Sequence, residues 1–232
     1  MKEIHKYHIW DIINIAIFYT IFVTFLVSCV MGVVKFSNGQ LTIDRVIYRF
    51  ALTILMCLPY AIKKIFNVSF SRLVSSLFYL YMFFAGFLGG IINFYTKLFW
   101  WDILIHFIMG LVISVLSIYI LNLTVYKKDR AKHNLFFTFL FMICFAMAIG
   151  ALWEIWEFAG DVLFSLNSQN HMGAVGLSAL KDTMIDLCVD FAGAICGVIF
   201  TAIAIKIDKK FLKTFYIKKL KNKEQEVESI EE

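Results

Sequence analysis

Six long apolar segments run along this 232-residue chain, at about residues 10–34, 46–62, 70–95, 102–124, 135–160 and 183–205. About 20 predominantly apolar residues are enough for a helix to cross the roughly 30 Å of hydrocarbon in a bilayer. With 61% hydrophobic residues, 17% charged residues and a mean hydropathy of +0.78, the chain is too apolar for a water-soluble globule. The sequence therefore predicts an all-α, polytopic transmembrane helical bundle with six spans. The second span is the shortest, and we expect its Pro59 to kink it.

The distribution of basic residues predicts the orientation of these spans. Lys and Arg concentrate before span 1, between spans 2 and 3, between spans 4 and 5, and after span 6, which together hold 17 of the 22. Positively charged connections stay in the cytoplasm, so both termini are predicted to be cytoplasmic. Because orientation in a membrane accounts for the net charge of +5, we expect no nucleic-acid partner.

The chain is predicted to hold one transmembrane domain, residues 1–205, followed by a cytoplasmic tail, residues 206–232, that is first basic and then acidic. Apolar residues interleave the basic part of the tail. It is therefore either an amphipathic helix on the anionic inner leaflet or a solvated segment that only fixes the topology. Two G-x-x-x-G patterns, Gly86 to Gly90 and Gly193 to Gly197, are expected to bring helices close together.

Ionisable residues gather in the last three spans. Seven of the 17 acids and one of the five histidines lie there: Asp102, His106, Glu154, Glu157, Asp161, Asp182, Asp186 and Asp190. Charged side chains inside a membrane cost several kcal/mol unless they pair or face a cavity, so they are candidates for function. Their spacings are i and i+4 in span 4, i, i+3 and i+7 in span 5, and i, i+4 and i+8 in span 6. Each spacing places its residues on one helix face.

The predicted orientation puts all three polar faces at the extracytoplasmic end of the bundle. Matching their depths predicts three layers, given from the deepest outward: His106, Glu154 and Asp190; Asp102, Glu157 and Asp186; Asp161 with Asp182 at the rim. His171, in the outer connection at 162–181, would supply a second imidazole at the rim.

Seven carboxylates this close cannot all stay ionised without compensation. Divalent cations could neutralise them, protons could remain on several, or basic residues of the outer connections could fold in as counter-ions: Arg45, Arg49, Lys97 and Lys181. Carboxylates with one or two imidazoles favour Mg, Mn, Ca or Zn over copper or an iron–sulfur cluster. The candidate metal ligands are Asp102, His106, Glu154, Glu157, Asp186 and Asp190. Alternatively, His106 only hydrogen-bonds to Asp102, one turn away.

Three motifs together resemble a known family. They are Trp101-Asp102-x-x-x-His106-Phe107, Ala151-Leu-Trp-Glu154-Ile-x-Glu157 and Asp182-Thr-x-x-Asp186-x-x-x-Asp190-x-x-Gly193-Ala194. Over roughly residues 98–200 the chain resembles the YjdF-like family of uncharacterised bacterial inner-membrane proteins and, more distantly, the VanZ-like family. Glu157 and Asp190 stand where the VanZ-like pattern has glutamine and asparagine, which favours the YjdF-like family. The resemblance implies a protein of the bacterial plasma membrane and brings no established chemistry.

Three functions fit these features, and the sequence does not decide between them. The first is a membrane enzyme that acts on lipid or lipid-linked envelope substrates, with Glu154, Glu157 and Asp186 as catalytic residues. The second is a proton- or cation-coupled transporter, although the acids stop near mid-membrane, no inverted repeat is apparent, and an oligomer would have to supply a second half. The third is a non-catalytic protein that binds an envelope ligand. G-x-S-x-G, Walker A, G-x-G-x-x-G and H-E-x-x-H patterns are all absent from the sequence, which removes the commonest soluble-enzyme alternatives.

Overall fold

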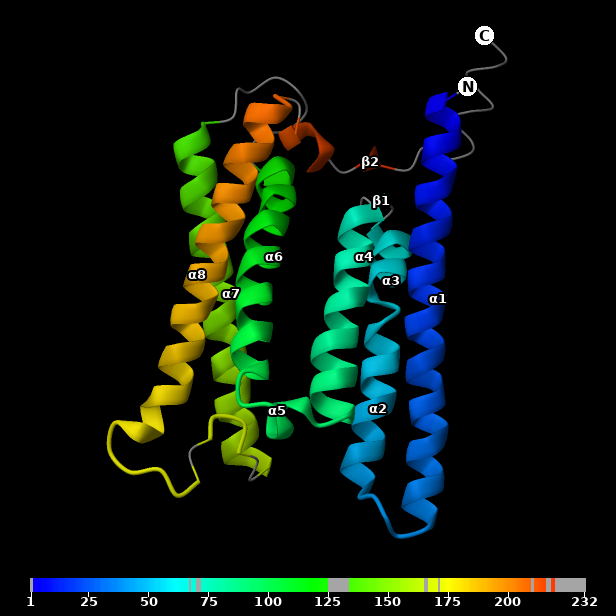
Figure 1. Cartoon of the computed structure of the whole chain (residues 1–232), viewed down its shortest axis with the longest axis vertical. Helices are drawn as coiled ribbons and strands as arrows, with labels where there is room; N and C mark the ends of the chain where they lie inside the picture. Colours follow the sequence, from blue (N-terminus) through cyan, green and yellow to red (C-terminus); the bar gives the residue numbers. More distant parts are fainter. Residues whose placement is uncertain are drawn as a thin grey trace. The chain divides into compact units, whose positions relative to one another are not determined.

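The computed structural model describes residues 2–66, 68–69, 72–124, 134–164, 167–170, 172–209, 211–215 and 218–219. They belong to two compact units: unit 1, Met1–Ile92 with Ile217–Glu232, and unit 2, Asn93–Tyr216 (Figure 1). Within the described ranges, five helices are long and apolar enough to cross a membrane: Ile12–Ser37, Val74–Ile91, Trp101–Asn122, Leu135–Leu163 and Leu180–Ile207. The predicted all-α fold is therefore confirmed, and five of the six predicted spans correspond to helical stretches long and apolar enough to cross a membrane.

The predicted second span is not one continuous helix. It is divided into α2 (Ile43–Leu55) and α3 (Leu58–Phe66) by a turn at Met56 and Cys57. Pro59 has no N–H, and in an unbroken helix its ring would clash with the carbonyl of Leu55. The chain instead closes a tighter turn, in which Cys57 N donates to the Ile54 carbonyl at 3.0 Å. The structure shows the expected disturbance near Pro59 as a two-residue interruption of the helix at Met56 and Cys57.

Unit 1 is built around its longest helix, α1 (Lys2–Ser37). Its other elements are α2, α3, β1 (Val68–Ser69), α4 (Arg72–Tyr81), the π-helical segment η1 (Met82–Ile91) and β2 (Lys218–Lys219). α1 packs against α2, α4 and η1, and β1 pairs antiparallel with β2. The core of the unit is formed by Ile21, Phe25, Met56, Tyr79 and Met82. The Asn14 amide also donates to the Ser76 hydroxyl at 2.7 Å, which joins α1 to α4.

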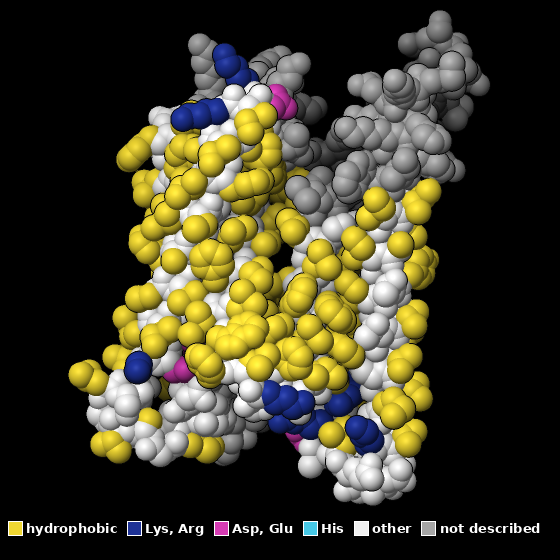
Figure 2. All heavy atoms as spheres, viewed as in Figure 1, with side chains coloured by type: hydrophobic (Ala, Val, Ile, Leu, Met, Phe, Trp, Pro, Cys, Tyr) yellow, Lys and Arg dark blue, Asp and Glu magenta, His cyan; other side chains and the backbone are white. Residues whose placement is uncertain are grey.

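Unit 2 is a bundle of three long helices, α6 (Trp101–Thr124), α7 (Leu135–Phe164) and α8 (Ser178–Ile207), which lie side by side in Figure 1. Two short helical elements accompany them, α5 (Phe94–Lys97) and η2 (Phe211–Phe215). On the face shown in Figure 2, hydrophobic side chains cover the length of the helices, while Lys and Arg lie toward the helix ends. Such an apolar outer surface suits contact with lipid.

Glycines bring α6 and α8 into close contact. A Cβ at Gly110 would overlap the backbone carbonyl of Asp190, and one at Gly193 would overlap the carbonyl of Phe107. A Cβ at Gly197 would meet the Ser114 hydroxyl. The packing role expected for the Gly193 to Gly197 pattern is confirmed. This close approach fixes the register that sets His106, one turn before Gly110, opposite α8.

The predicted tail is described only in part. α8 continues to Ile207, and η2 then packs against the end of α6, where Leu212 and Phe215 are buried. The Asn122 amide donates to the Leu212 carbonyl at 3.2 Å. The acidic end of the tail lies outside the described residues.

Candidate functional site

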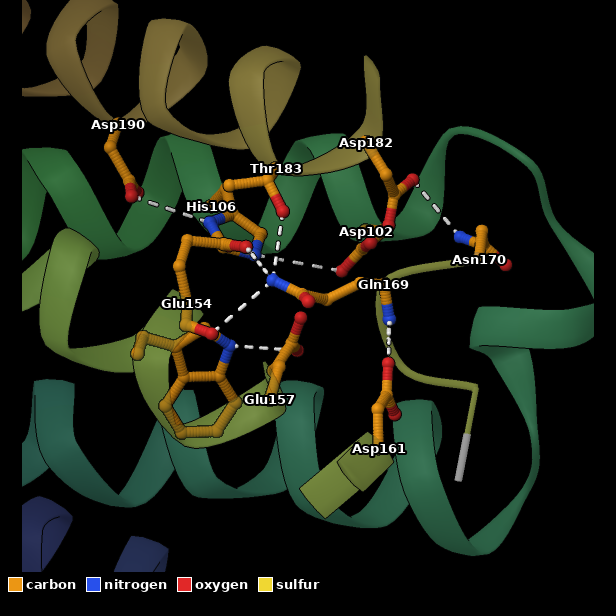
Figure 3. Close-up of polar contacts among 11 residues, drawn as sticks. Asp102, His106, Glu154, Glu157, Asp161, Gln169, Asn170, Asp182, Thr183 and Asp190 are labelled. Carbon is orange, nitrogen blue, oxygen red and sulfur yellow. Dashed lines mark hydrogen bonds and ion pairs between the residues drawn. The ribbon is translucent and has the colours of Figure 1, made fainter. Parts of the chain in front are cut away.

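His106 is the centre of the polar cluster in unit 2. Its side chain is only 3% exposed, and its Nδ1 lies 3.4 Å from Asp190 Oδ2. Its Nε2 lies 3.8 Å from Asp102 Oδ1 and 4.0 Å from Glu154 Oε1 (Figure 3). One imidazole therefore contacts carboxylates of α6, α7 and α8. The three residues of the layer predicted to be deepest are in contact with one another through this ring.

Asp102, His106 and Asp186 form a compact group of potential metal ligands among the described residues. Each offers one ligand atom, and these atoms all lie within 4.8 Å of one another. Asp102 precedes His106 by one turn of α6, and Asp186 precedes Asp190 by one turn of α8, so both acids project toward the same ring. His106 and Asp186 are buried, and Asp102 is half-buried. Two carboxylates and an imidazole are a donor set suited to a divalent cation.

Several carboxylate oxygens in the cluster are buried without a hydrogen-bond partner among the described residues: Glu154 Oε1, Asp182 Oδ2, Asp186 Oδ2 and Asp190 Oδ1. Asp190 is fully buried, and Glu154 is only 4% exposed. A buried acceptor without a partner loses its hydration and gains nothing in return. The close nitrogen contacts described for Asp102, Glu154 and Asp190 are made by the His106 ring, which carries a charge only when it is protonated. The cluster therefore has free capacity for a cation or for the hydrogen-bond donors of a ligand.

Gln169 closes the site from the loop that joins α7 to α8. Its Nε2 donates to the Thr183 hydroxyl at 2.8 Å and lies 3.2 Å from Glu154 Oε2 and 3.3 Å from the Glu154 carbonyl. In Figure 3 its side chain extends among residues of both helices. Gln169 thus links α7 to α8 beside the carboxylate that contacts His106.

The two acids predicted at the rim hold this loop. The Asp161 carboxylate accepts hydrogen bonds from the backbone N–H groups of Ser168, at 2.7 Å, and Gln169, at 3.0 Å. Asp182 Oδ1 accepts one from the Asn170 amide at 3.0 Å. Asn170 itself has the left-handed φ of 48° that a tight turn requires. These contacts give Asp161 and Asp182 a direct part in shaping the end of the site next to this loop.

Glu157 and His171 differ from the other predicted residues. Glu157 is half-buried, and its Oε1 accepts a hydrogen bond from the indole of Trp153, one turn earlier in α7, at 3.0 Å. Its described hydrogen bond therefore stays within its own helix, whereas Glu154 reaches His106. His171 lies outside the described residues.

A cavity of about 550 Å³ lies next to the cluster, between α7, α8 and the loop. Its polar lining residues are Glu154, Asp161, Gln169 and Thr183, and its apolar ones are Ile155, Phe158, Val162 and Leu180. The four apolar residues are 53% to 63% exposed. The cavity therefore connects the polar site with the apolar flank of α7 and α8.

Sequence reasoning missed three residues that shape the site: Gln169, Thr183 and Gly150. Gln169 belongs to the polar run Asn167-Ser168-Gln169-Asn170, which interrupts an otherwise apolar sequence. This run is the sequence feature that could have indicated a role for Gln169 in the site. Gly150 lies against the Asp190 carboxylate, so a Cβ there would overlap Oδ2. Nothing local in the sequence marks this contact, because it depends on how α7 packs against α8.

Comparison with known proteins finds a matching family and a relative. The chain matches the family described as "Predicted membrane protein (DUF2238)" over residues 16–206. It is also 31% identical over 136 residues to a protein of Thermotoga maritima described as an uncharacterized protein, in a match that covers 58% of this chain and 65% of that relative. The chain thus spans just under two thirds of the length of this relative.

No solved structure matches the chain. The resemblance to the YjdF-like family agrees with the family match, since DUF2238 is the YjdF family. The matched range includes all of the cluster around His106. The chain belongs to the DUF2238 family of predicted membrane proteins.

Proposed function

We propose that the cluster around His106 is the divalent-cation site of a membrane enzyme that acts on a lipid or lipid-linked envelope substrate. The observation that carries this proposal is the Asp102, His106 and Asp186 group, with ligand atoms within 4.8 Å, surrounded by buried carboxylate oxygens that lack partners among the described residues. Mg²⁺, Mn²⁺, Ca²⁺ or Zn²⁺ would bind through these oxygens and the imidazole. The VanZ-like resemblance contributes nothing to the proposal.

The proposed setting is the outer face of a bacterial plasma membrane. In this arrangement α2 and α3 together make a sixth, broken crossing, and both termini are cytoplasmic. The bias of Lys and Arg toward alternate connections supports this orientation. Single cysteines placed at Ser37 and at Asp208, in a variant whose five native cysteines are replaced by serine, test it: a membrane-impermeant thiol reagent should label only the first in intact cells.

Lipid is the proposed substrate class because of the adjacent cavity. The apolar flank formed by Ile155, Phe158 and Leu180 suits an acyl or prenyl chain, while Glu154 and Gln169 lie at its polar end. An amphiphile could therefore present its head to the site without leaving the membrane.

The proposed reaction is a hydrolysis in which Glu154 is the general base. A bound divalent cation would polarise the phosphoryl or carbonyl oxygen of the substrate. Glu154 takes one proton from water as the water oxygen bonds to phosphorus or to the carbonyl carbon. The bond to the leaving oxygen breaks, and that oxygen receives the proton from Glu154. Glu157, one turn away, is the alternative base, and Asp186 holds the cation.

Cation binding and lipid turnover test this proposal together. Full-length protein in detergent is titrated with Mn²⁺ by electron paramagnetic resonance, then incubated with envelope lipid extract, and the products are identified by mass spectrometry. Asp186→Asn should weaken Mn²⁺ binding about tenfold or more, because it removes one charged ligand, and Glu154→Gln should abolish turnover while Mn²⁺ still binds. Asp44→Asn, at an exposed acid of unit 1, is the matched control. Protein that binds no divalent cation and leaves the extract unchanged would end the proposal.

A proton- or cation-coupled transporter is the second candidate, because buried hydroxyl groups continue beyond the acids. Ser114 and Ser117 of α6, Thr138 of α7 and Thr201 of α8 are fully buried, and the Thr201 hydroxyl lacks a partner among the described residues. Toward the other end of the bundle, the acidic residues of α6, α7 and α8 are therefore followed by buried hydroxyl groups. Proteoliposomes should then show a proton or cation flux that Asp190→Asn and Thr201→Val reduce. Liposomes without such flux would count against this candidate.

A further inference from the structure

Among the residues that the structure describes, Arg49 of α2 is a buried cation without an anionic partner. The residue is 8% exposed, and its Nε has no hydrogen-bond partner among the described residues. Its described hydrogen bond runs from Nη1 to the backbone carbonyl of Arg45 at 3.0 Å. The neighbouring acid, Asp44, lies 3.9 Å from Arg45, and both of those side chains are exposed. Within the described part of the chain, the guanidinium group of Arg49 thus keeps unused donors and an unneutralised charge.

The packing of α1 accommodates this arginine. A Cβ at Gly32 would lie 2.8 Å from Arg49 Cδ and 3.3 Å from Arg49 Nε, so a larger residue there would displace the side chain. Gly32 thereby lets the stem of the arginine lie against α1. Together with the hydrogen bond to the Arg45 carbonyl, this contact keeps the arginine side chain within unit 1.

The arginine lines a cavity of about 420 Å³ within unit 1. Lys35 lines the same cavity, and the apolar side of the cavity is formed by Val23, Val27, Met31, Phe87, Ile91 and Ile92. From Val23 to Lys35, α1 rises by about 18 Å at 1.5 Å per residue. Two cations therefore lie at one end of a mostly apolar groove, which Thr24 and Ser28 also line. Basic side chains also gather at the end of unit 1 where α1 joins α2 (Figure 2).

We propose that this groove binds one anionic phospholipid, with its phosphate on Arg49 and Lys35 and an acyl chain along α1 and η1. The planar guanidinium group matches the geometry of a phosphate, and a buried arginine in a membrane protein calls for such a counter-charge. The apolar groove explains why the anion is the head of a lipid, since a free phosphate would leave the residues from Val23 to Met31 uncovered. The site belongs to unit 1 alone and does not depend on the chemistry at His106.

Lipid retention by the purified full-length protein tests this site. The protein in detergent is mixed with dioleoyl phosphatidylglycerol or dioleoyl phosphatidylcholine, and the bound lipid is counted by native mass spectrometry. One molecule of phosphatidylglycerol should bind tightly to each protein. Arg49→Gln should lower the affinity for this lipid about tenfold or more, because a charge-assisted hydrogen bond is lost. Arg45→Gln, at the exposed neighbour, should leave binding unchanged. Equal retention of both lipids, or equal binding by wild type and Arg49→Gln, overturns the proposal.

A second pair of variants keeps Arg49 in place. Val27 is 56% exposed and lines the groove, so Val27→Trp should fill it and reduce phosphatidylglycerol retention severalfold without disturbing the core. Val33, 47% exposed on the same helix, does not line the groove, and Val33→Trp is the control. Inorganic phosphate is the third probe. If phosphate alone competes fully with the lipid and Val27→Trp changes nothing, the site is an oxyanion site and the lipid proposal is wrong.

Discussion

The carboxylate of Asp190 lies directly against Gly150, although the two residues belong to different helices. A Cβ at position 150 would overlap Asp190 Oδ2 and would lie 3.1 Å from its Cγ. The same Oδ2 atom lies 3.4 Å from His106 Nδ1. The bare backbone of α7 at Gly150 therefore leaves the space in which a fully buried acid of α8 meets the imidazole of α6.

Gly150→Ala is expected to destabilise the protein and to weaken the cation site. Alanine normally stabilises a helix interior by about 1 kcal/mol relative to glycine. Here its methyl group must displace the Asp190 carboxylate, and overpacking of this kind costs about 1–3 kcal/mol. Thermal unfolding in detergent and Mn²⁺ titration measure the two effects. Ala148→Ser, which adds one atom at an exposed position of α7, is the control; a Gly150→Ala protein as stable as wild type would show that the carboxylate has room to move.

Helical periodicity made the acids of the site predictable, and the distribution of Lys and Arg predicted that they share one end of the bundle. Asp102 and His106, or Asp186 and Asp190, share a face because four residues make about one turn. The contacts of Gln169 were beyond this reasoning, because a loop has no periodicity to indicate where its side chains point. Gly150 was equally hidden, since its role depends on the register of α7 against α8. Pro59 predicted a disturbance of the second span, but whether a proline bends or divides a helix depends on the packing around it.

Gln169→Glu should make the free energy of unfolding depend more strongly on divalent cations than it does in the wild-type protein. The amide donates toward Glu154 Oε2, and a carboxylate in its place would put two like charges together in a buried site. We expect a loss of about 1–3 kcal/mol in the free energy of unfolding without metal, most of which Mn²⁺ restores. Chemical denaturation with and without Mn²⁺ measures this.

The control for this variant is Gln40→Glu, at an exposed residue of unit 1. It makes the same chemical change far from the acids in sequence. If Mn²⁺ rescued both variants equally, or neither of them, the link between Gln169 and the cation site would be lost.

Asp161→Ala should release the loop between α7 and α8. The carboxylate accepts two backbone N–H groups, and hydrogen bonds to a charged group contribute about 1.5–3 kcal/mol each. Amides at residues 167–170 should then exchange with deuterium about tenfold to a hundredfold faster, since 1.4 kcal/mol corresponds to a factor of about ten. Hydrogen-exchange mass spectrometry measures this, with Asp44→Ala as control. Unchanged exchange would mean that the loop is held mainly by Gln169 and Asn170.

Divalent cations should stabilise the wild-type protein, and the effect should increase with the ratio of the cation concentration to its Kd. A ligand that binds only the folded state at about 100 times its Kd adds about 2.7 kcal/mol to the free energy of unfolding. Mn²⁺ at that concentration should raise the Tm, and a chelator should return it to the starting value. Asp102→Asn removes one of the three grouped ligands and should raise the Mn²⁺ concentration needed for the same rise in Tm by about tenfold. Asp44→Asn should leave this concentration unchanged. A Tm that rises equally in both variants would indicate a general salt effect on the protein, because cations at the His106 cluster must respond to the loss of Asp102.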